Sequence, residues 1–80
     1  MIITPRQVAA ARGVLRWTQA ELARQAKAPK SVIALFETRR RLPASATLCD
    51  LKRALEAAGV EFIDAEPGVR LRAVEAEREA

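Results

Sequence analysis

The chain has 80 residues, a formal net charge of +4, one cysteine and no histidine. A chain of this size is one domain, and its composition excludes a disulfide within the chain, a zinc site built from cysteines and histidines, and any catalytic triad that needs a histidine. Residues 1–41 carry nine basic and two acidic side chains, a net +7, whereas residues 42–80 carry five basic and eight acidic ones, a net −3, which suggests that one half faces a polyanion.

Capping patterns predict the first two helices. Thr4 can cap a helix whose first residue is Pro5, and the side chain of Gln7 can reach back to complete a capping box. Gly13 is expected to end this helix. A second capping box, T-x-x-E at residues 18–21, predicts the start of the next helix, with the carboxylate at its end reaching back to the cap.

A third helix is expected from about Pro29 to Thr38, after a very short break. Within it Ile33 and Phe36 are spaced to face inward, and Leu42-Pro43 prevents any continuation. A fourth helix is predicted to begin near Ser45 and to end at Gly59. Its leucines recur at helical spacing along one face.

Beyond the fourth helix the pattern changes to β-type alternation. Residues 60–63 and 69–72 read as two strands, residues 64–68 as the turn between them, and residues 73–80 as an acidic tail. A hairpin of two strands is marginal alone, so it either packs on the helices or pairs with its copy in a second subunit. The candidate dimer contacts on one face of this hairpin are Val60, Phe62, Val69 and Leu71.

The sequence therefore predicts a mostly α-helical domain of four to five helices with a short C-terminal β-hairpin or strand pair. Residues 1–59 form the helical part, and residues 60–80 form the hairpin and tail, the candidate dimerisation element. The compact pair of helices at residues 18–38 is the important unit, because two helices joined by so few residues must cross at a large angle.

This unit resembles the helix-turn-helix of the lambda-repressor and Cro-like family, also called XRE-like. The resemblance rests on the string Trp17–Ala23 and extends from about Gln7 to Val60, two-thirds of the chain. It implies a compact DNA-binding domain in which one helix rests on the phosphate backbone and the next enters the major groove. The residues that carry the pattern are Gln19, Ala23, Lys27, Ile33, Phe36 and Glu37.

The resemblance also implies a role for individual residues. Lys30, Ser31 and Leu35 match the base-contacting positions of the family's recognition helix. Lys30 would donate to guanine, Ser31 would donate or accept, and Leu35 would make an apolar contact such as one with a thymine methyl group. The phosphate contacts that the resemblance implies are Thr18, Gln19, Arg39, Arg40 and Arg41.

The resemblance implies a structural role, rather than a DNA contact, for two further positions. Arg12 and Glu37 match a pair that often forms a salt bridge between the first and third helices. The chain departs from the family at three places: Lys27 stands where glycine is usual in the turn, Pro29 where a capping serine or threonine is usual, and Thr38-Arg39 where a polar residue and glycine are usual. These departures affect how the recognition helix is entered.

The leading functional hypothesis is a sequence-specific DNA-binding transcriptional regulator, a repressor that acts as a homodimer with helix 29–38 in the major groove. One alternative is an antitoxin that neutralises a toxin partner, through the acidic tail, and autoregulates its operon. Another is a purely structural or partner-binding bundle. The sequence has no nucleophile–base pair that would support an enzyme, and no residues that indicate a cofactor or a metal site.

The expected location is the cytoplasm, in association with the nucleoid. No apolar run approaches the roughly 18 residues needed to span a bilayer, so no membrane partner is expected. The first five residues are too short, and lack the basic flank, for a signal peptide.

Overall fold

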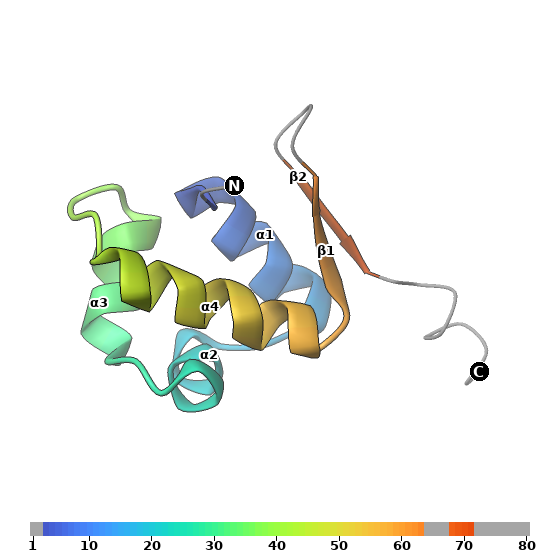
Figure 1. The fold of residues 1–80 in the computed structure, drawn as a ribbon, viewed down its shortest axis with the longest axis horizontal. Coiled ribbons are helices and arrows are strands. Elements are labelled where there is room, and N and C mark those ends of the chain that lie inside the picture. The colour runs from blue at the N-terminus through green and yellow to red at the C-terminus, as the bar shows by residue number, and fades with distance from the viewer. Residues whose placement is uncertain (1–2, 64–67, 72–80) are drawn as a thin grey trace.

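The computed structural model describes residues 3–63 and 68–71, which form four α-helices followed by two antiparallel strands (Figure 1). The expectation of a mostly α-helical domain with a short strand pair is confirmed. Most of the expected turn, residues 64–67, and the acidic segment 73–80 lie outside the described residues. The elements are α1 (Pro5–Leu15), α2 (Gln19–Ala26), α3 (Lys30–Glu37), α4 (Ser45–Ala57), β1 (Val60–Ile63) and β2 (Gly68–Leu71).

The start of α1 has the predicted capping box. The hydroxyl of Thr4 accepts a hydrogen bond from the N–H of Gln7 at 3.1 Å, and the N–H of Thr4 donates to Oε1 of Gln7 at 2.9 Å. Gln7 is itself buried, and its Nε2 donates to the carbonyl of Ile63 at 3.2 Å. One side chain therefore caps α1 and ties it to the end of β1.

The end of α1 differs from the prediction. The helix does not stop at Gly13 but continues to Leu15, and Arg16 takes the left-handed conformation with φ of 60°. The N–H of Trp17 then donates to the carbonyl of Arg12 at 2.9 Å. Because this hydrogen bond closes the last turn, the reversal falls on Arg16, and Gly13 stays within the helix.

The start of α2 has half of its predicted capping box. The hydroxyl of Thr18 accepts from the N–H of Glu21 at 3.0 Å, as expected. The carboxylate of Glu21 does not reach back to the cap, because it accepts hydrogen bonds from Arg24 and Gln25 one turn along the helix. The ion pair with Arg24 and the hydrogen bond from Gln25 take the place of the expected hydrogen bond between the N–H of Thr18 and the Glu21 carboxylate.

The connection between α2 and α3 is three residues long. Lys27 ends α2 in the left-handed conformation with φ of 57°, where the family usually has glycine, and the N–H of Ala28 donates to the carbonyl of Ala23 at 3.0 Å. Pro29 lies just before α3 rather than in its first turn, and α3 begins at Lys30. In Figure 1, α2 is seen almost end-on while α3 runs up the side of the molecule, so the two helices cross.

The core lies where the helices meet. α4 passes across the others in Figure 1 and packs on α1, α2 and β1, while α3 packs on α1 and α2. Each helix contributes apolar residues at a spacing of three or four, which gives one buried cluster. The buried apolar side chains are Ile3, Val8, Ala11, Leu22, Ala26, Ile33, Phe36, Leu48, Leu51, Leu55 and Val60.

The strand pair covers one end of this core. Val60 pairs with Leu71 and Phe62 with Val69, and α1 packs on β2 while α4 packs on β1. Val60 is fully buried and cannot contact a second subunit, so its place among the dimer contacts is wrong. The reason is that this face of the hairpin closes the protomer's own core. Phe62 and Val69 pack partly against it, and the side chain of Leu71 lies outside the described part.

Candidate nucleic-acid interface

The first turn of α3 is open to solvent. Lys30 and Ser31 are its first two residues, and both are exposed. Pro29 provides no side-chain cap, so the amides of Lys30 and Ser31 have no acceptor within the helix, whereas the N–H of Val32 donates to the carbonyl of Pro29 at 3.1 Å. This end of α3 thus presents a lysine, a hydroxyl and two unpaired amides to an external acceptor.

Leu35 lies one turn further along α3 and is half-buried. Its carbonyl accepts from the N–H of Arg40 at 2.8 Å, which is part of the helix end. Because the residue is half-buried, its side chain offers only part of its surface to a ligand.

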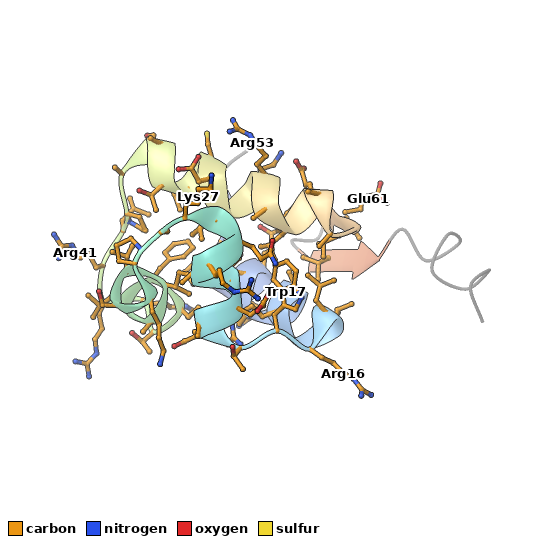
Figure 2. The ribbon with its side chains drawn as sticks, turned by 90° about the horizontal axis from the view of Figure 1, so that it is seen from below. Arg16, Trp17, Lys27, Arg41, Arg53 and Glu61 are labelled. Carbon is orange, nitrogen blue, oxygen red and sulfur yellow. The ribbon has the colours of Figure 1, made fainter. Side chains whose placement is uncertain are left out.

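The arginine cluster, Arg39, Arg40 and Arg41, follows α3 directly, and all three residues are exposed. Arg39 has φ of 64°, and its N–H donates to the carbonyl of Phe36 at 2.9 Å, so the chain reverses in a Schellman motif with arginine where glycine is usual. Figure 2 shows Arg41 projecting away from the helices. Among the described residues, no carboxylate forms an ion pair with any of the three.

α3 is held in place by an ion pair at its end. Nε and one terminal nitrogen of Arg12 donate to the two carboxylate oxygens of Glu37 at 2.7 and 2.8 Å, and another terminal nitrogen donates to the carbonyl of Trp17 at 2.8 Å. The side chains of Arg12 and Glu37 are only 21% and 7% exposed. The pair named from the family pattern is thus present as a two-pronged contact that joins α1 to α3.

The protonation of this pair follows from its surroundings. Burial alone would raise the pKa of the Glu37 carboxyl, but the hydrogen bonds from Arg12 and Gln19 and the positive charge of Arg12 outweigh burial and hold that pKa below its ordinary value of 4.5. The hydrogen bond to Glu37 raises the pKa of Arg12. Both groups are therefore charged near neutral pH.

The two phosphate-contact candidates on α2 are partly engaged within the protein. The hydroxyl of Thr18 caps α2, and Nε2 of Gln19 donates to Glu37 at 3.1 Å. The amides of Gln19 and Ala20 lie in the first turn of α2, where no acceptor within the helix is available. The backbone amides of Gln19 and Ala20 are therefore better placed than the side chains of Thr18 and Gln19 to donate hydrogen bonds to an anion at the start of α2.

Three contacts of this region have no signal in the sequence. The bond from Gln19 to Glu37 and the bond from Gln7 to Ile63 depend on how distant segments pack, and the bond from Arg12 to the Trp17 carbonyl depends on how the chain turns after α1. Only the capping role of Gln7 could be predicted locally. The general reason is that side-chain contacts between elements depend on the docking of those elements.

The described part of the chain provides neither the residues of a metal site nor a membrane-spanning helix. Residues 3–63 and 68–71 contain no group of three or more histidine, cysteine, aspartate or glutamate side chains placed to hold a metal ion. None of the helices within those residues combines the length and apolar character that crossing a bilayer requires.

No protein-family model matches this chain, and no curated protein matches it at a significant level.

Proposed function

We propose that this protein is a sequence-specific DNA-binding transcriptional regulator, a repressor with a lambda-repressor-like arrangement of helices, which places α3 in the major groove and acts as a homodimer. The observation that carries the proposal is the make-up of α3. Its first turn is exposed and uncapped at Lys30 and Ser31, its end leads into the unpaired arginine cluster, and Glu37 braces it from behind.

The dimensions of α3 support this placement. A helix of eight residues is about 12 Å long, which is close to the width of the major groove of DNA. With the first turn of α3 at the base edges, the arginine cluster at its other end would lie at the height of the phosphate backbone. The amides at the start of α2 would meet another phosphate.

A dimer supplies the length of sequence that one protomer cannot read. Two copies would place their α3 helices in successive major grooves about 34 Å apart. With Val60 buried, the proposed dimer contact is reduced to the parts of the hairpin that remain accessible, at Phe62 and Val69. Leu71, the fourth residue of the predicted contact, pairs with Val60 in the strand register, and its side chain lies outside the described part.

The test is selection of a preferred DNA sequence from a random pool, followed by binding measurements with the double variant Lys30→Ala/Ser31→Ala. The ratio of affinity for the selected sequence to affinity for random DNA should fall by about tenfold or more, because two base contacts are removed. Arg53→Ala, an exposed arginine on α4, is the matched control and should leave the ratio unchanged. Equal ratios for the double variant and the wild type would reject the base-contacting role.

The antitoxin hypothesis stays a prediction. It assigns toxin contact to the acidic tail, which lies outside the described residues, and no contact among the described residues favours it. Co-purification of a basic protein partner with the full chain is the observation that would support it.

A further inference from the structure

A surface cavity lies beside the arginine cluster, and its apolar part has no role in the proposed DNA contacts. It has a volume of about 360 Å³. This is within the range of about 300–1,000 Å³ that small-molecule sites occupy. The walls come from two distant parts of the chain, residues 3–5 before and at the start of α1, and Phe36 with residues 39–42 at and after the end of α3.

The apolar part of the cavity consists of a fixed floor and an exposed wall. Ile3 and Phe36 are each only 2% exposed and belong to the core, so the floor is held in place by the fold. Leu42 is 73% exposed although it lines the same cavity. A single exposed leucine is ordinary, but one that borders a concave apolar surface can be covered by a ligand of modest size.

The rim of the cavity is positively charged. All three members of the arginine cluster line it, and none is paired with a carboxylate among the described residues. Guanidinium groups bind carboxylates and phosphates with two parallel hydrogen bonds, and they do so more strongly where water is partly excluded. The best complement to this cavity is therefore a molecule with an apolar body and an anionic head.

We propose that the cavity is a binding site for small amphipathic anions, such as a medium-chain carboxylate, with the apolar body against Phe36 and Leu42 and the head group on the arginine cluster. A small molecule fits better than a folded partner, because a stable protein interface buries about 800 Å² on each side and this site is a local hollow. Binding would occupy arginines assigned to DNA phosphates, so the anion would lower DNA affinity; this consequence rests on the proposed function.

The binding test uses the full chain without DNA. Decanoate, decanol and acetate are titrated separately, below the concentrations at which they aggregate, while backbone amide signals are followed by NMR. Decanoate should saturate with a Kd of about 0.1–1 mM, as expected for a ligand of this size. It should shift the amides of residues 39–42, decanol should bind at least tenfold more weakly, and acetate should not saturate.

Two variants and a control locate the site. Leu42→Ser and the double variant Arg40→Ala/Arg41→Ala each alter exposed residues, so both should fold, which thermal unfolding checks. Each should weaken decanoate binding at least tenfold. Arg53→Ala removes an exposed arginine that does not line the cavity and should bind decanoate as the wild type does.

Three outcomes would overturn the proposal. The first is equal binding of decanoate and decanol, and the second is chemical-shift changes located away from residues 39–42. The third is that the amide signals of residues 39–42 change with protein concentration but not with decanoate, which would show that a second copy fills the cavity. The consequence for DNA is measured separately, by adding decanoate to the complex with the selected sequence. Decanoate binding without an effect on that complex would leave the site standing and reject the shared use of the arginines.

Discussion

At the scale of single residues, Glu37 is a buried carboxylate whose charge must be balanced by its neighbours. It is almost fully buried, and its two oxygens accept hydrogen bonds from Arg12 and Gln19. A buried carboxylate is tolerated only where such donors satisfy it, because an unpaired buried charge is strongly destabilising. The same three residues come from α1, α2 and α3, so one carboxylate links the first three helices.

This arrangement predicts the effect of Glu37→Gln. The variant keeps the shape of the side chain but leaves the Arg12 charge without its partner, and the free energy of unfolding should fall by about 2–3 kcal/mol. Urea denaturation at pH 7 measures this. Glu21→Gln is the control, since the Glu21–Arg24 pair is largely exposed and should matter little.

The same site predicts a pH dependence. Because the pKa of Glu37 is lower in the folded protein than its ordinary value of 4.5, the stabilisation it provides is present above that value and is lost as the pH falls through the folded-state pKa. Stability measured between pH 7 and pH 3 should therefore drop less steeply in Glu37→Gln than in the wild type. Parallel curves for the two proteins would contradict this account.

At the scale of helices and strands, the ends of α1, α2 and α3 share an unusual feature. Each helix is followed by a basic residue in the left-handed conformation, at Arg16, Lys27 and Arg39. Glycine is normally preferred there, because a side chain costs about 1 kcal/mol in this conformation. A positive charge beside the negative end of the helix dipole offsets part of this cost. α4 instead uses Gly59, with φ of 107°.

Gly13 within α1 and Gly59 after α4 predict opposite effects of the same substitution, glycine to alanine. Gly13 lies inside α1 with open space around its missing Cβ, so Gly13→Ala should raise the free energy of unfolding by about 0.5–1 kcal/mol. Gly59→Ala should lower it by about 1–2 kcal/mol, because alanine is strained at a positive φ. Denaturant unfolding of both variants tests the pair, and a loss of stability in Gly13→Ala would show that the glycine has another role.

At the scale of the whole molecule, the arginine cluster and the strand pair lie at opposite ends of the described structure (Figure 1). Figure 2 shows Arg41 at one end of the protein and Glu61 at the other. The basic residues 39–41 follow α3, whereas the strand pair lies at the far end of α4 (Figure 1). Under the proposed function, this arrangement would turn the arginine cluster toward the DNA and keep the hairpin away from it.

This separation predicts how salt affects DNA binding. Replacing Arg40 and Arg41 by alanine should lower affinity for all DNA sequences alike, and the slope of log affinity against log salt should fall by about 2, since each lost phosphate contact removes about 0.9. Binding titrations from 50 to 300 mM salt, roughly the range in which such slopes are measured, provide the test. Arg53→Ala should keep the wild-type slope; an unchanged slope in the double variant would place both arginines outside the DNA contact.

The sequence by itself determined what depends on neighbours along the chain. Thr4 and Thr18 predicted the starts of α1 and α2, the leucine spacing predicted α4, and the alternation after Gly59 predicted the two strands, because caps and periodicity act within a few residues. The pairing of Arg12 with Glu37 came from the resemblance, since no local rule joins residues 25 positions apart.

Only the tertiary structure decided which surfaces remain available. It buried Val60 against the helices and brought residues 3–5 beside the arginine cluster to form a cavity. Each of these results depends on how much apolar surface the docked elements cover together. Burial of that kind is a property of the packed molecule, and the order of residues alone does not specify it.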